Sequence, residues 1–175
     1  MFTCRHDAVQ DVLVEMLRKV FDPASVWKMY IYHRSYSPRY EPDIKVLNYD
    51  GRGRGLIIGM VIGFPCASSY VGAASREPRR GAGVEEGRGE YLCGDVSPHK
   101  LVPFAVETFR GLGVQAKKFL GVCAERGYDR LGPELVSATW STPTFKSYWG
   151  RKLMVALRGL QAFGLHTWAL DDFPQ

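Results

Sequence analysis

Leu56-Ile57-Ile58-Gly59-Met60-Val61-Ile62 forms the apolar segment around which the fold can be predicted. Apolar residues occupy both alternating faces of this short run, which is typical of a strand in the middle of a sheet, covered on both sides. The preceding Asp50-Gly51-Arg52-Gly53-Arg54-Gly55 predicts a hairpin turn. Because its glycines precede a strand and do not open a helix, they do not match a dinucleotide-binding loop.

The periodicity of apolar residues predicts the other elements. A helix over 7–21 carries one apolar stripe, made of Val9, Val12, Leu13, Met16, Leu17 and Val20. Asp7 is expected to cap this helix and Pro23 to close it. Strands are predicted over 26–32, 43–47 and 100–108, a helical turn or two within 67–75, and helices over 113–126 and 144–163. The inward-facing residues expected on the last two helices and the last strand are Ala116, Phe119, Leu120, Cys123, Phe145, Trp149, Leu153, Leu157, Leu160, Val102, Phe104 and Val106.

Composition and length limit the class of protein. The chain has 175 residues, of which 46% are hydrophobic and 23% charged, as in a single globular domain. The longest apolar run, from Leu56 to Cys66, is shorter than the roughly 18–20 residues that a membrane helix needs. The N-terminus is charged by Arg5 and lacks the apolar core of a signal peptide. We therefore expect an intracellular protein of the nucleus or cytoplasm, neither secreted nor in a membrane.

The net charge and the cysteine content give weaker evidence about the binding partner and about metal or disulfide sites. The net charge is +5, and arginine outnumbers lysine 15 to 8, which favours a nucleic-acid partner because arginine binds phosphate and guanine edges well. The cysteines at 4, 66, 93 and 123 form no CxxC pair and are expected to be buried or free thiols. Cys4 and His6 could end a zinc knuckle that starts upstream, but two ligands do not make a tetrahedral site.

Several short motifs, in order along residues 5–163, resemble one known family. They are Arg5-His6-Asp7, Glu41-Pro42-Asp43-Ile44, Gly55-Leu-Ile-Ile-Gly-Met-Val-Ile-Gly-Phe-Pro65, Val102-Pro-Phe-Ala-Val-Glu-Thr-Phe-Arg-Gly-Leu-Gly113, and the closing Phe145-Lys-Ser-Tyr-Trp149 and Val155-Ala-Leu-Arg-Gly-Leu-Gln-Ala162. The chain resembles the restriction-endonuclease-like domain at the C-terminal end of reverse transcriptases in site-specific non-LTR retrotransposons. That domain belongs to the PD-(D/E)xK nuclease superfamily.

The resemblance implies an α/β fold with a restriction-endonuclease-like core, in the order α-β-β-β-α-β, around a small central mixed sheet with C-terminal helices. The core would take residues 1–128, and a helical extension over 129–175 would pack on the same domain. A flexible Gly/Arg-rich insertion is expected over about 76–95. Its four central glycines would cost a helix about 4 kcal/mol relative to alanine; they are Gly81, Gly83, Gly87 and Gly89.

The resemblance also implies a chemistry. Members of the superfamily hydrolyse phosphodiesters with Mg²⁺ that carboxylates hold, and the cation activates water and neutralises charge on the phosphate. Asp43 matches the first acid and would be the metal ligand, and Asp11 or Glu15 could supply the assisting acid of the opening helix. Without the resemblance, an aspartate after Pro42 reads as an ordinary turn-closing residue.

The second acid is where the sequence departs from the family. Gly59 stands where an aspartate is expected, and Met60 and Val61 follow in place of an x-Lys partner. In Gly87-Arg-Gly-Glu-Tyr91, Glu90 replaces an expected lysine, and a neighbouring arginine cannot activate water because it stays protonated. The sequence therefore predicts a retrotransposon-derived, endonuclease-like domain that is catalytically impaired and retains affinity for DNA or RNA.

Three alternatives remain open at this point. The chain could be an active Mg²⁺-dependent DNA endonuclease with a migrated acid at Glu41, Asp50 or Glu15. It could instead be a non-catalytic nucleic-acid-binding module that uses its Gly-interleaved arginines, which otherwise belong to a solvated loop: Arg52, Arg54, Arg76, Arg79, Arg80 and Arg88. It could also be a genomic remnant without a selected role. No reverse transcriptase activity and no small-molecule substrate are expected of this chain.

Overall fold

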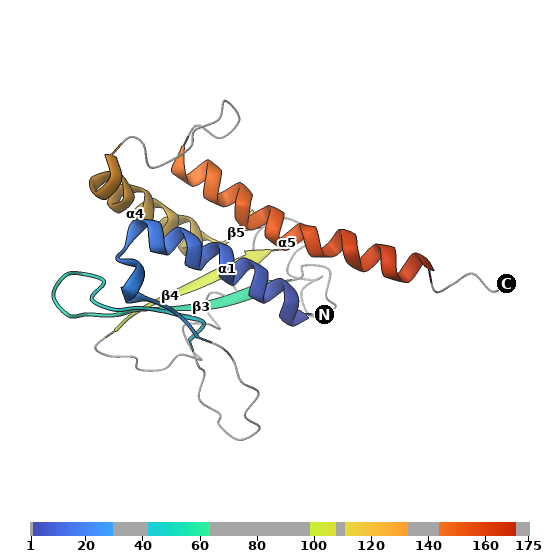
Figure 1. Ribbon diagram of the computed structural model, residues 1–175, viewed down its shortest axis with the longest axis horizontal. Helices are drawn as coiled ribbons and strands as arrows, with labels where there is room; N and C mark the ends of the chain where they lie inside the picture. The colour runs from blue at the N-terminus through green and yellow to red at the C-terminus, as the bar shows by residue number, and fades with distance from the viewer. Residues whose placement is uncertain (1, 30–41, 64–98, 108–110, 133–143, 171–175) are drawn as a thin grey trace, which may run out of the picture.

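The secondary structure is seen in a computed structural model that describes residues 2–29, 42–63, 99–107, 111–132 and 144–170 (Figure 1). In chain order, its elements are α1 (Phe2–Val20), the 3-10 turn η1 (Pro23–Ser25), β1 (Val26–Lys28), β2 (Ile44–Val46), β3 (Leu56–Gly63), β4 (Lys100–Glu107), β5 (Gly111–Leu112), α4 (Val114–Leu131) and α5 (Phe145–Leu170). Predictions that fall outside these residues concern the helical turns of 67–75, the insertion over 76–95 with its glycines and arginines, Glu41 and Glu90.

A mixed sheet lies at the centre of the fold. Among the described residues its strands follow the order β1-β2-β3-β4-β5, and β3 runs antiparallel to β2 and parallel to β4. The parallel ladder spans both strands in full, from Leu56 opposite Lys100 to Gly63 opposite Glu107. The prediction that Leu56–Ile62 is a central strand is confirmed, since β3 has a neighbour on each side and its first five residues are buried. The chain is thus an α/β protein with a small mixed sheet.

The hydrophobic core lies where the helices meet the sheet. Helix α1 packs on β1 and β3 and also on α4 and α5, while α4 covers β4 (Figure 1). The rings of Phe104 on β4 and Phe119 on α4 meet edge to face, with centroids 6.4 Å apart. The predicted inward-facing residues are buried or partly buried, which confirms the periodicity; Leu160 lies among the side chains outside the described set.

Element boundaries differ from the prediction in several places. Helix α1 begins at Phe2 instead of residue 7, so Asp7 lies inside the helix and does not cap it, because Arg5 and His6 continue the helical backbone. Helices α4 and α5 continue to Leu131 and Leu170, well past their predicted ends. The two-residue strand β5 was not predicted, since so short a segment has no periodicity to detect.

The structure bears on two further expectations, the state of the cysteines and the lack of a membrane-spanning helix. Cys123 is a free, buried thiol, as predicted, and burial raises its pKa to about 12. The side chains of the other three cysteines lie outside the described part of the chain. None of the described helices is both long and apolar enough to cross a membrane.

The packing of α5 on α1 predicts a large cost for truncating its core side chains. Leu153 is fully buried in the core, so Leu153→Ala is expected to lower the free energy of unfolding by about 2–5 kcal/mol. Val155 lies on the same helix but is 67% exposed, and Val155→Ala should change stability by no more than about 0.5 kcal/mol. Urea unfolding of both variants measures the difference, and equal effects would contradict this packing.

Candidate functional site

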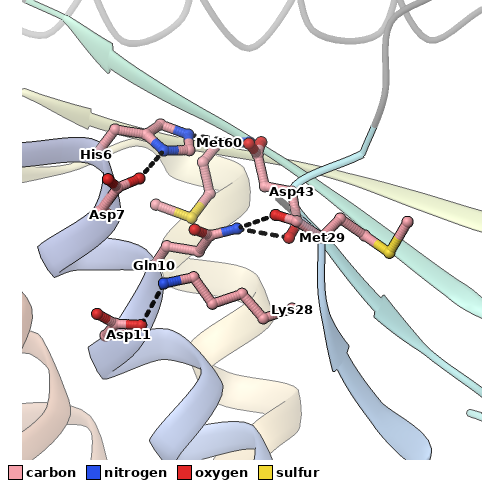
Figure 2. Close-up of polar contacts among 8 residues, drawn as sticks. All are labelled: His6, Asp7, Gln10, Asp11, Lys28, Met29, Asp43 and Met60. Carbon is pink, nitrogen blue, oxygen red and sulfur yellow. Dashed lines mark hydrogen bonds and ion pairs between the residues drawn. The ribbon is translucent and has the colours of Figure 1, made fainter. Parts of the chain in front are cut away.

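The buried carboxylate of Asp43 is the centre of the candidate site (Figure 2). Asp43 directly precedes β2, and its side chain is only 3% exposed. One oxygen, Oδ2, accepts a hydrogen bond from the backbone N–H of Met60 at 2.5 Å, and the other, Oδ1, lies 2.9 Å from Nε2 of His6. Each carboxylate oxygen therefore has a donor from another part of the chain.

Strand pairing brings Asp43 to this place. In the antiparallel register of β2 and β3, Ile44 lies opposite Ile58, and the Asp43 N–H donates to the Ile58 carbonyl at 3.0 Å. The Asp43 carboxylate then reaches the amide of Met60, which follows Gly59 in β3. The two positions that the family resemblance singles out thus lie side by side on neighbouring strands.

Gln10 joins helix α1 to the backbone of the site. Its amide nitrogen donates to the carbonyl of Asp43 at 2.6 Å and to the carbonyl of Met29 at 3.1 Å, and the residue is only 2% exposed. The Met29 N–H also donates to the Asp43 carbonyl. Gln10 therefore holds the ends of β1 and β2 against the helix.

His6 lies one helical turn before Gln10, on the same face of α1. Its Nε2 contacts Asp43, and its Nδ1 lies 3.6 Å from Oδ1 of the exposed Asp7. The hydrogen bond that His6 donates to Asp43 raises the pKa of His6, burial opposes this by favouring the neutral ring, and Asp7 adds a smaller contribution in the raising direction. The net effect is a His6 pKa above its ordinary value of 6.5.

Asp11 and Glu15, proposed from the sequence as assisting acids, have other partners. Asp11 lies 2.5 Å from Nζ of Lys28, and Figure 2 shows it turned toward that lysine and away from Asp43. Glu15 lies 2.7 Å from Nζ of Lys152 on α5. Both acids line a shallow pocket of about 410 Å³, together with Val14, Arg18, Lys19 and Lys28. The α1 side chains that contact Asp43 are instead His6 and Gln10.

Sequence reasoning missed the roles of His6 and Gln10, although one signal was present. Gln10, Leu13 and Leu17 follow each other at three- and four-residue spacing, so Gln10 continues the apolar stripe of α1. A polar residue on a buried face needs a hydrogen-bond partner there. The sequence does not say which partner, because Asp43 lies 33 residues further along the chain.

A second buried carboxylate, Glu107, is too far along the sheet to complete the site. Glu107 ends β4 opposite Gly63, while Gly59 lies opposite Pro103. Four residues of strand separate the two positions, which is about 13 Å at the usual rise per residue. Two carboxylates that share a cation must approach much more closely than that.

Residues 47–55 connect the antiparallel strands β2 and β3, which confirms the hairpin turn predicted at Asp50–Gly55. The Asp50 carboxylate accepts from the backbone N–H groups of Arg52 at 2.8 Å and Arg54 at 3.1 Å, and these bonds lower the pKa of Asp50. Gly51 and Gly53 have positive φ values of 73° and 89°, which glycine adopts without strain. The Arg52 and Arg54 side chains extend into solvent at the tip of this turn.

Arg126 of α4 anchors the base of the same hairpin. Its guanidinium lies 4.2 Å from the ring centroid of Tyr49 and 5.5 Å from that of Phe21, and it donates to the Tyr49 carbonyl. Lys100 of β4 lies 5.6 Å from the same Tyr49 ring. The hairpin is thus attached to both α4 and the sheet. The other predicted nucleic-acid ligands, Arg79, Arg80 and Arg88, lie outside the described residues.

Comparison of this chain with protein-family models, with curated proteins and with solved structures finds no match in any of the three. Its function must therefore be argued from its own residues.

The His6–Asp43 contact predicts a pH-dependent stability. Because the folded-state pKa of His6 is raised above 6.5, its contribution is complete below pH 6.5 and is lost as pH rises through the folded-state pKa. The stability difference between wild type and His6→Gln should therefore decrease with increasing pH. Urea unfolding of both proteins across this range measures it, and the other histidines cancel because both proteins contain them. A difference that stays constant or grows with pH would contradict the assignment.

Proposed function

We propose that this chain is a retrotransposon-derived, endonuclease-like domain of the restriction-endonuclease-like type that has lost efficient catalysis and retains nucleic-acid binding. One observation carries the proposal: Asp43, the expected first acid, contacts the backbone amide next to Gly59, where the second acid is expected. The two positions meet as a shared metal site would require, and only one of them has a carboxylate.

The order and pairing of the elements support the same proposal. Helix α1 precedes three strands that pair as an antiparallel meander, β1-β2-β3, and β4 then joins β3 in parallel. A parallel connection needs a crossover of a dozen or more residues, often helical, and residues 64–98 are long enough to provide it. The described elements agree with the α-β-β-β start and the last strand of the expected α-β-β-β-α-β core, and the second helix of that core would fall within 64–98, outside the described residues.

The residues at Asp43 do not fit a magnesium ion. Mg²⁺ requires near-octahedral oxygen ligands, including one or two carboxylates with water and phosphate oxygens in the remaining positions. Both oxygens of the Asp43 carboxylate already accept from protein donors, Gly59 has no side chain to add, and the described residues contain no group of three or more possible metal ligands. We therefore propose no catalytic step that passes through a metal.

The described candidates for a migrated acid are each engaged elsewhere. Asp50 accepts from the two amides of its own hairpin, and Glu15 pairs with Lys152 on α5. These contacts weigh against an active endonuclease that uses either residue. Glu41 lies outside the described residues.

Nucleic-acid binding is supported by the hairpin and by charge. Arg52 and Arg54 project from a turn whose backbone is fixed by Asp50, and the chain has a net charge of +5. Guanidinium groups on a fixed backbone are suited to phosphate oxygens of DNA or RNA. Arg79, Arg80 and Arg88 belong to the same proposed surface on sequence grounds alone.

The loss of catalysis can be tested with supercoiled plasmid in the presence of Mg²⁺ or Mn²⁺. Wild type and Asp43→Ala are expected to be equally inactive, because the wild-type site already lacks its second acid. Agarose electrophoresis of the plasmid after prolonged incubation measures nicking and linearisation. Robust cleavage by wild type that disappears in Asp43→Ala would refute the impaired site and establish a working nuclease.

Binding through the hairpin predicts a specific salt dependence. For each phosphate contact removed, the slope of log K against log salt should fall in magnitude by about 1, so Arg52→Ala/Arg54→Ala should reduce it by about 2. The matched Arg52→Lys/Arg54→Lys variant keeps both charges and should retain most of the wild-type slope. Fluorescence anisotropy with labelled duplex and single-stranded oligonucleotides gives these values. Unchanged slopes in the alanine variant would exclude this hairpin as a phosphate-binding element.

A further inference from the structure

We propose that His6 acts as a built-in substitute for a cation at Asp43, so that it closes the site to metal independently of the missing acid at position 59. This inference rests on the proposed function and deepens it. Metal binding at this place would then be prevented by two separate features of the chain, the glycine of β3 and the histidine of α1.

The contacts of Asp43 account for both of its oxygens. Met60 N–H donates to Oδ2 at 2.5 Å, and the His6 ring nitrogen Nε2 lies 2.9 Å from Oδ1. The Asp43 side chain is 3% exposed, so water has almost no access to the remaining lone pairs. A buried carboxylate is costly without such partners, and His6 is a partner that can carry a positive charge.

The histidine and a cation compete for the same lone pair of Oδ1. A bound Mg²⁺ lies about 2.1 Å from its ligand oxygens and needs further ligands around it. Nε2 of His6 lies 2.9 Å from Oδ1, at hydrogen-bond distance, so it occupies one of the few lone pairs that this buried carboxylate offers. A cation that takes this lone pair must displace the imidazole.

The histidine is also held in place by the helix that carries it. Gln10 follows one turn later and donates to the carbonyls of both Asp43 and Met29, so this part of α1 is fixed to the ends of β1 and β2 (Figure 2). An N–H at Nε2 donates whether the ring is neutral or protonated. The obstruction therefore depends on the position of His6 and persists in either charge state.

The test restores the missing acid with and without the histidine. Mn²⁺ binding is measured from the electron paramagnetic resonance signal of the free ion, in Gly59→Asp, Gly59→Asp/His6→Ala and Gly59→Asp/His6→Gln. We expect Mn²⁺ affinity at least about tenfold higher in the alanine double variant than in Gly59→Asp alone, because removing the imidazole leaves the buried Asp43 carboxylate without this partner. The glutamine double variant retains an N–H donor toward Asp43 and should behave like Gly59→Asp. Equal affinities in all three proteins would overturn the inference.

A second measurement uses the wild-type chain and requires no substituted protein to fold. The ring nitrogens of His6 are observed by ¹⁵N NMR during a titration with Mg²⁺ into the millimolar range, with His6→Gln used to assign them. The inference requires resonances that do not move, and a saturable shift would overturn it. Neither experiment contains nucleic acid. Failure of the plasmid or oligonucleotide tests would therefore remove the proposed function without changing the results of these two metal-binding experiments.

Discussion

The full-length parallel ladder between β3 and β4 holds the centre of the fold together. Every residue of β3 is paired on that side, and on the other side its first three residues pair with Ile44, Lys45 and Val46 of β2. The strand therefore lies inside the sheet, and the burial of its first five residues agrees with its nearly continuous apolar sequence. It also fixes where the ends of β2 must lie, and so sets the position of Asp43.

The buried carboxylate of Asp43 explains the polar residues near the start of helix α1. The helix covers the sheet with apolar side chains from Val9 to Val20, yet near its start it presents His6 and Gln10 to the buried carboxyl and carbonyl groups of Asp43. Buried polar groups are tolerated when they are hydrogen-bonded. The polar start of α1 and the buried acid are therefore parts of one arrangement, which couples the helix to the two neighbouring strands.

Local patterns predicted much of this fold, because periodicity reports which face of an element is buried. The stripe of α1, the inward residues of α4 and the central position of β3 all followed from spacing alone. The start of α1 was misplaced because Arg5 and His6 have no apolar periodicity. The partners of Asp43 could not be predicted for a different reason: they come from segments 17 and 37 residues away in sequence, and only the tertiary fold brings them together.

The anchoring of the β2–β3 hairpin by Arg126 has a consequence for how its arginines would meet a ligand. Stacking on Tyr49 and Phe21, with the hydrogen bond to the Tyr49 carbonyl, attaches the base of the turn to α4, and Asp50 fixes its tip. A flexible loop loses backbone conformational entropy when it binds a ligand. In this hairpin that entropy is lost when the chain folds. Within this hairpin, the rotamers of the exposed Arg52 and Arg54 are the part still to be ordered, so the hairpin's share of the entropy lost on contact comes mainly from these two side chains.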